Sequence, residues 1–204
     1  LEADVSITNL AGHKLPTAYP SRRAWLHVTI KDRNGQIIFE SGALKPDGSI
    51  AGNANDMDPN RFEPHRRVID EEKQVQIYEA IMVDPDDQVT TGLLRAIRFM
   101  KDNRILPQGF DKTSADDDIA VKGKAEADTD FTGGSDKIRY SVSVDTNSGP
   151  FRIQARLWYQ PIGFRWAQNL KQQQAAEIDR FVSYFNENSG QSGIVMAKDL
   201  RVVE

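Results

Sequence analysis

The sequence contains no cysteine among its 204 residues. This absence excludes disulfide bonds, thiolate catalysis, zinc sites with cysteine ligands, iron–sulfur clusters and haem attached covalently through a C-x-x-C-H motif. A chain of this length buries a substantial core without such cross-links. We therefore expect one domain over residues 1–204 that binds no cofactor covalently.

The sequence also lacks a strong excess of charge and a long apolar run. Its 26 Lys and Arg residues against 30 Asp and Glu residues give a net charge of −4. Without a polybasic run, nucleic acid is not expected as a partner. No segment approaches the roughly 20 apolar residues that cross a bilayer. The sequence starts at Leu1 without an initiating Met or a signal peptide, and we interpret it as an excised or processed piece of a longer chain.

Alternation of apolar and polar residues predicts β-strands. Residues 24–30 alternate strictly, and the turn signal Asn34-Gly35 separates them from 36–40, so these segments predict a hairpin. The same alternation is found in 74–83, 138–144 and 151–159. The last two segments are separated by a turn signal and predict a second hairpin.

Helical periodicity is confined to the last part of the chain. Apolar residues at steps of three and four predict a helical excursion over about 162–188, ended by Asn186–Gly190, and a short strand is expected around 200–203. These patterns favour a mainly β fold, a β-sandwich of the Ig-like or Greek-key type with long loops and a C-terminal helical segment. The long loop 43–72 is rich in turn residues, and long loops are often functional.

The three histidines differ in what their neighbours predict. His13 lies in the run Gly12-His13-Lys14-Leu15-Pro16, whose glycine and proline fix a non-helical bend in which the ring is free either to bind a metal or to cap the turn. His27 lies within a predicted strand, where a structural or solvent-facing role is the simpler interpretation. His65 follows Pro64, and we expect an ordinary loop contact.

The carboxylates predict no catalytic pair. Glu79 falls on the apolar face of its predicted strand, so it must be paired, and we expect an arginine partner among Arg22, Arg23 and Arg104. The run 116–118 is acidic but lacks the spaced ligands of a calcium loop, so a solvated charge run is expected. A hydrolase that uses Glu79 and an aspartate is the disfavoured alternative, and we do not expect an enzyme.

Several ordered blocks carry a resemblance to a known family. The blocks are Asn9-Leu10, Gly12 to Thr17, Tyr19 to Leu26, Phe39 to Gly42, Val75 to Glu79, Lys101 to Pro107 with Gly109-Phe110, Leu157 to Gln160 and Ile194 to Ala197. In this order they resemble the C-terminal, non-haem, β-rich domain of bacterial multihaem c-type cytochromes. One departure is Ala18, which stands where that domain usually has a glycine.

The resemblance implies an exported electron-transfer protein, periplasmic or extracellular, whose haem c groups are attached in a preceding segment. That multihaem segment is then the expected partner, with a redox protein as a further one. In such cytochromes a histidine outside the attachment motif can be the sixth iron ligand, and His13 is the candidate here. Tyr19 and Trp25 would border the haem edge, and Arg22 and Arg23 would pair with its propionates.

Two functions from different classes follow. The first is a haem-free accessory domain that covers or ligates a haem of the preceding segment or docks a redox partner. The alternative is a secreted β-sandwich module that binds carbohydrate or calcium through the 43–72 loop.

Overall fold

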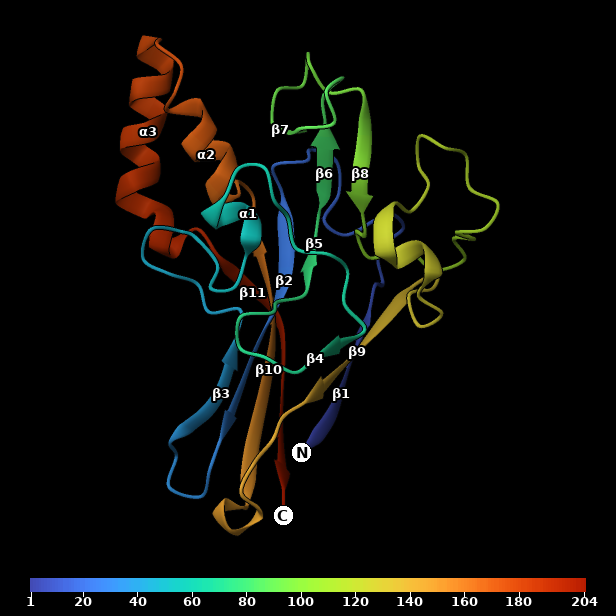
Figure 1. Cartoon of the computed structure of the whole chain (residues 1–204), viewed down its shortest axis with the longest axis vertical. Coiled ribbons are helices and arrows are strands. Elements are labelled where there is room, and N and C mark those ends of the chain that lie inside the picture. The colour runs from blue at the N-terminus through green and yellow to red at the C-terminus, as the bar shows by residue number, and fades with distance from the viewer.

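The computed structural model describes all residues, 1–204, and is mainly β with several sheets. Figure 1 shows an elongated molecule with both chain termini near the same end. The strands are β1 (Glu2–Thr8), β2 (Arg23–Lys31), β3 (Ile37–Ser41), β4 (Val68–Ile69), β5 (Ile77–Tyr78), β6 (Ala80–Val83), β7 (Val89–Thr90), β8 (Arg98–Asp102), β9 (Ser135–Ser141), β10 (Phe151–Gln160) and β11 (Ile194–Val203). The helices are α1 (Ala54–Met57), α2 (Phe164–Leu170) and α3 (Ala176–Asn188), with short 3-10 turns η1 (Gly123–Ala127), η2 (Thr146–Ser148) and η3 (Ser189–Gln191).

The main core lies between two sheets. One has the order β1-β9-β4 and the other β11-β10-β2-β3, with β5 added to β2. Alternate residues of β2, from Ala24 to Ile30, point to the side of β9 that carries Ile138 and Tyr140, and all are buried. Burial of one face of each sheet is what the period-2 alternation requires. The prediction of a mainly β, sandwich-like fold is confirmed.

The first predicted hairpin is present. β2 and β3 pair antiparallel, with Ile30 opposite Phe39. Within the turn, the Asp32 carboxylate accepts hydrogen bonds from the backbone N–H of Asn34 and of Gln36, and Gly35 has φ of +80°. The turn therefore needs a residue that tolerates the left-handed region at position 35, and the sequence supplies glycine there.

The second predicted hairpin is wrong. β9 pairs with β1 and β4, whereas β10 pairs with β2 and β11, so the chain crosses from one sheet to the other between them. Both strands present their apolar face to the same core, but from opposite sides. Alternation of apolar and polar residues predicts a strand with one buried face, but it does not predict to which sheet that strand belongs.

The segment 74–83 is also less regular than its alternation predicts. It is divided at Glu79 into β5, which pairs with β2, and β6, which pairs with β7 and β8 in a third sheet. Both faces of this segment are buried, including Gln76, Tyr78 and Met82. The chain therefore passes through the interior here, and no face of it is free for solvent.

The C-terminal part contains the predicted helical excursion as two helices, α2 and α3, joined by residues 171–175. The predicted short strand at 200–203 is longer: β11 begins at Ile194 and pairs along β10. In the loop 43–72 the structure adds α1 and β4. None of the helices is both long and apolar enough to span a bilayer.

Candidate functional site

The bend that carries His13 is fastened to a distant segment. Asn9 is buried, and its side-chain amide donates hydrogen bonds to the carbonyls of His13 (2.9 Å), Ile105 (3.1 Å) and Leu106 (3.2 Å). Leu15 forms an antiparallel bridge with Ile105. One asparagine thus closes the bend on itself and ties it to the chain after β8, so the backbone at His13 is held on both sides.

A charged cluster supports the same bend. The Lys14 ammonium donates to Asp102 (2.8 Å) and to the carbonyl of Ile119 (2.7 Å), and Arg104 binds the same carboxylate through two nitrogens. Burial alone would raise the pKa of Asp102, but the hydrogen bonds and charges of Arg104 and Lys14 outweigh it and lower that pKa. Asp102 is therefore an ionised anchor for the bend.

The His13 ring itself is exposed. Its Nδ1 lies 3.3 Å from the carbonyl of Lys14, and its Nε2 has no hydrogen-bond partner in the protein. The arrangement is an imidazole with one nitrogen directed to solvent on a backbone that is held in place. An imidazole nitrogen of this kind is a donor that haem iron accepts.

The next residues in the bend occupy different environments. Tyr19 is 48% exposed and packs on Trp166 of α2, with 5.7 Å between ring centroids. Arg22 donates from Nη1 to the carbonyl of Thr17 (3.2 Å), and its other guanidinium nitrogens have no partner. Ala18 adopts φ of +56°, so a residue other than glycine has a left-handed backbone here.

Arg23 and Trp25 were predicted to contact haem, but the structure buries both residues. The Arg23 guanidinium is buried and forms an ion pair with Asp56 (2.8 Å), a hydrogen bond to Gln160 and another to the carbonyl of Gly48. Trp25 is fully buried and stacks on Trp158. Both residues lie on the outer face of β2 beneath the 43–53 loop, so neither reaches a haem at the surface.

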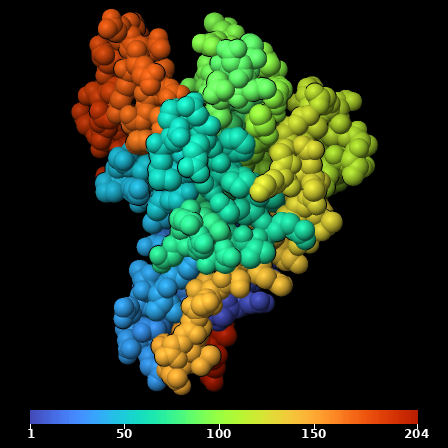
Figure 2. Space-filling view, viewed as in Figure 1, coloured from blue at the N-terminus to red at the C-terminus, as the bar shows by residue number.

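Tyr19 opens onto a large hollow of the surface. This cleft has a volume of about 780 Å³ and separates the helices α2 and α3 from the segment 89–95. Figure 2 shows the gap between the orange helices and the green lobe. Its walls include the apolar side chains Tyr19, Pro59, Leu93, Leu94, Trp166 and Phe181. Of the five residues predicted to contact haem, only Tyr19 lines this cleft.

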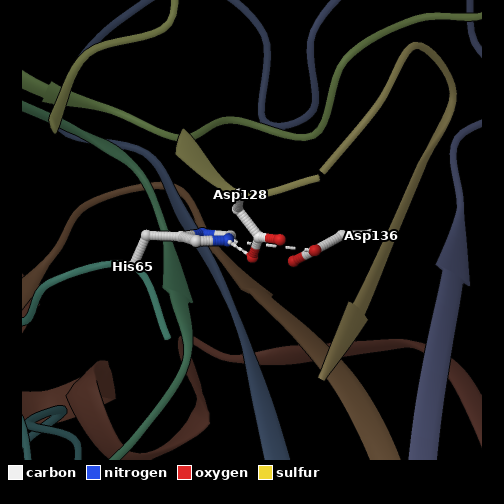
Figure 3. Close-up of side chains that lie close together, drawn as sticks. All are labelled: His65, Asp128 and Asp136. Carbon is white, nitrogen blue, oxygen red and sulfur yellow. Dashed lines mark hydrogen bonds and ion pairs between the residues drawn. The ribbon is translucent and has the colours of Figure 1, made fainter. Parts of the chain in front are cut away.

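A buried cluster that the sequence did not reveal surrounds His65. The His65 ring is 4% exposed, and Asp128 and Asp136 are each 1% exposed. Figure 3 shows the two carboxylates converging on one edge of the imidazole. His65 Nε2 lies 3.0 Å from Asp128 Oδ2 and 3.9 Å from Asp136 Oδ1. The expected ordinary loop contact is thus a fully buried polar contact.

The hydrogen bonds around His65 fix its proton on Nε2. Gln76 accepts the backbone N–H of Arg66 with its side-chain oxygen, and Asn103 accepts that of Glu79. Each amide therefore directs its NH₂ group to His65 Nδ1, at 2.8 Å from Gln76 and 3.1 Å from Asn103. With two donors facing Nδ1, that nitrogen is an acceptor, and the Nε2–H donates to Asp128.

The same environment shifts two pKa values in opposite directions. Burial lowers the pKa of His65 to about 4, although Asp128 opposes the shift. Burial raises the pKa of Asp136 to about 6, and the nearby charge of Asp128 adds to it. Asp136 accepts from the Tyr78 hydroxyl (2.7 Å) and from the backbone N–H of Lys137 (2.8 Å).

The cluster contains the residue types that bind metals, but their side chains are hydrogen bonded to one another and to other groups of the protein. One ligand atom from each of His65, Asp128 and Asp136 lies within 4.8 Å of the other two. The His65 nitrogens and the two carboxylates already have hydrogen-bond partners, and Arg67 lies 3.3 Å from Asp128. The arrangement joins the 58–76 segment to β9 and to the end of η1, which is a structural role. No local spacing could have indicated it, because His65 and Asp128 are 63 positions apart.

Glu79 has a buried partner of another type than predicted. Its carboxylate is 2.9 Å from the Lys101 ammonium, which also donates to the carbonyl of Ile77 (3.0 Å). The prediction that Glu79 is paired is confirmed, but the arginine partner is wrong. Of the predicted arginines, Arg23 binds Asp56 and Arg104 binds Asp102. Pairing of β6 with β8 places the lysine next to Glu79, and the sequence alone does not give that register.

The remaining candidates are engaged in ordinary contacts. His27 is half-buried, with Nε2 2.8 Å from Glu40. In the 43–72 loop, Asp56 binds Arg23, and Glu63 binds Arg66. The acidic run 116–118 is exposed, and Asp117 pairs with Lys122. The expected solvated character of this run is therefore observed, and Asp56 and Glu63 of the long loop are bound within the fold.

Comparison with known protein families gives no match, and no curated protein sequence matches either. Among solved structures, the fold is similar to the crystal structure of a penta-heme cytochrome c552 from Thermochromatium tepidum, with a TM-score of 0.52 and 13% sequence identity. The similarity covers 99% of this chain and 36% of that protein, so the chain spans about a third of its length. At this identity the similarity concerns the fold alone: nearly the whole chain adopts a fold that is found within a multihaem cytochrome c.

Proposed function

We propose that this chain is a haem-free accessory domain of an exported multihaem cytochrome c, periplasmic or extracellular. It packs against a haem-bearing segment, covers one haem and supports electron transfer without catalysis of its own. Three observations support the proposal. The fold is similar to part of a penta-heme cytochrome c552. The sequence blocks occur in the order that the family resemblance requires, and the absence of cysteine restricts covalent haem c to another segment.

The observation that carries the proposal is the presentation of His13. Its Nε2 is free, its ring is exposed, and its backbone is fixed by Asn9 and by the Lys14–Asp102–Arg104 cluster. A ligand to a haem held by another segment needs both features, because a mobile backbone would lose entropy on binding and a buried ring would not reach the iron. A haem held in this way supplies reversible one-electron storage.

Two further residues of the bend complete the proposed contact. Arg22 keeps free guanidinium donors that suit a haem propionate. Tyr19 offers a half-exposed aromatic ring, which Trp166 holds in place. His27 and His65 do not compete for this role, because His27 is bound to Glu40 and His65 is enclosed.

The experiment uses a haem c peptide that carries its own proximal histidine and leaves the sixth iron position open. Added to this chain, the peptide is expected to change from a high-spin to a low-spin absorption spectrum at a lower concentration of chain than of free imidazole. His13→Ala should abolish this gain. His27→Ala is the matched control and should preserve it, because His27 is already hydrogen bonded to Glu40.

Two outcomes would contradict the proposal. One is a chain that binds the haem peptide no better than imidazole does. The other is a His13→Ala variant that binds as tightly as the wild type. Circular dichroism of each variant establishes that the fold is intact, and no change is expected because the His13 side chain is exposed.

A further inference from the structure

We infer that the uncovered part of the outer face of the β11-β10-β2-β3 sheet is a docking surface for an acidic protein partner. This inference goes beyond the proposed function and does not depend on His13 or on haem. The surface is defined here as the basic face, and it consists of the outward-pointing residues Thr29, Lys31, Gln154, Arg152, Arg156, Lys198, Leu200 and Val202.

The two halves of this outer sheet surface differ in how they are covered. In the half near α1, Trp25 and Trp158 stack and are packed under Leu44 and Ile50 of the long loop. Beyond Trp158 no element covers the sheet, and Arg152 and Lys198 are exposed. A sheet in a sandwich commonly leaves one face to solvent, so exposure alone does not indicate a partner.

The arrangement of charge on the basic face does indicate one. In the β2–β10 register Arg152 lies directly opposite Lys31, and in the β10–β11 register Arg156 lies opposite Lys198. Like charges directly opposite one another on a sheet destabilise the fold. None of these four side chains forms an ion pair or a hydrogen bond within the protein, although the net charge of the chain is −4. Glu40, which lies opposite Thr29, is the one carboxylate on the outer side of these four strands, and it is paired with His27.

The edge strand β11 adds an apolar contribution to the same surface. Leu200 and Val202 are 46% and 61% exposed and point outward, opposite Gln154 and Arg152. Asp199 and Arg201 lie instead on the side of the core and pair with each other. This polarity is the reverse of a normal sandwich strand, in which apolar residues face the core. Charged residues on the inner side of an edge strand oppose edge-to-edge aggregation.

These features together fit a folded acidic protein better than another polyanion. A protein that presents carboxylates around an apolar centre would neutralise the four cations and cover Leu200 and Val202. Nucleic acid presents a phosphate backbone without an apolar centre and would leave Leu200 and Val202 uncovered. Charge complementarity of this kind sets the orientation and the rate of docking.

The test compares two variants that remove the same number of cations. The face variant carries Arg152→Gln, Arg156→Gln and Lys198→Gln. The control variant carries Lys45→Gln, Lys124→Gln and Arg180→Gln, which are exposed, free of ion pairs and outside the basic face. A second face variant, Arg152→Lys with Arg156→Lys, keeps the charge. Thermal unfolding by circular dichroism monitors the fold of each protein.

The probe is a short poly-glutamate peptide at low salt. We expect the wild type to bind it, with protection from amide hydrogen exchange confined to β2, β10 and β11. The face variant should bind at least about tenfold more weakly, whereas the control and the charge-preserving variant should bind about as the wild type does. Added salt should weaken binding in the wild type because the charges are exposed.

Several results would overturn the inference. Equal loss in the face and control variants would mean that only bulk charge matters. Tighter binding to duplex DNA or to phosphatidylglycerol vesicles than to poly-glutamate would assign another class of partner. Sedimentation showing self-association that the face variant abolishes would make the occupant a second copy of this chain. An absence of binding to poly-glutamate would also refute it.

Discussion

The buried pair His65 and Asp136 makes opposite contributions to the pH dependence of stability. The pKa of His65 falls from 6.5 to about 4 on folding, so its unfolded form takes up a proton first as the pH falls. Its stabilising contribution is complete above pH 6.5 and is lost as the pH falls toward 4. The pKa of Asp136 rises from 3.8 to about 6, so the folded form binds the proton first and gains stability as the pH falls from 6.

The two effects are similar in size. One pKa unit corresponds to about 1.4 kcal/mol, so each shift corresponds to about 3 kcal/mol of unfolding free energy. Between pH 6 and pH 4 they largely cancel in the wild type. Asp136→Asn removes the compensating group and should lose about 3 kcal/mol more than the wild type on going from pH 6.5 to pH 4. His65→Gln removes the other group and should change by about the same amount in the opposite direction.

Urea unfolding at several pH values measures both variants. Trp25, Trp158 and Trp166 supply the fluorescence signal. The comparison uses the difference between variant and wild type at each pH, so carboxylates elsewhere in the chain cancel. The comparison concerns only how the unfolding free energy changes with pH, so a variant that is less stable at neutral pH can still be used. If the three stability curves run parallel between pH 4 and 6.5, burial does not hold His65 neutral, and the reasoning fails.

Two further predictions concern buried polar contacts. Glu79→Ala leaves the buried Lys101 ammonium without its carboxylate and should reduce the unfolding free energy by about 3 kcal/mol, whereas Glu79→Gln should cost less, and unchanged urea midpoints in both would contradict the pairing. Asn9→Ala removes four hydrogen bonds, three donated by the side-chain amide and one accepted from the backbone N–H of Ala11, and should cost about 2 kcal/mol. Amide hydrogen exchange in residues 11–16 should become faster in the Asn9 variant, and unchanged exchange would show that other contacts hold the bend.

The sequence predicts a fold element well when one local pattern decides it. The β2–β3 hairpin follows from alternation on both sides of Asn34-Gly35, and the turn chemistry lies within a few residues. β9 and β10 show the limit of this reasoning. Each has a clear apolar face, but their assignment to different sheets depends on which of several strands competes best for each edge. The packing of the whole core decides this assignment, and the connection between β9 and β10 does not.

The candidate site shows the same division between local and distant determinants. The bend at His13 is predicted from its own glycine and proline, and Ala18 adopts φ of +56° within it without being a glycine. The partner of Glu79 and the surroundings of His65 depend on segments brought together by folding. The amides of Gln76 and Asn103 become donors to His65 only because backbone N–H groups occupy their oxygens. Such an orientation leaves no pattern in the sequence.

The basic face depends on an irregularity that no periodicity could indicate. The register between β10 and β11 shifts between Leu157 and Trp158, so Val195 lies opposite Trp158 and Ala197 opposite Leu157. Because side chains alternate with a period of two, this extra residue reverses the faces of everything that follows it. Without the shift, Lys198 and Leu200 would point toward the core, and Asp199 and Arg201 would point outward. The bulge therefore brings Lys198 opposite Arg156 and exposes the apolar residues of β11, so the docking surface and the reversed polarity of the edge strand have one structural cause.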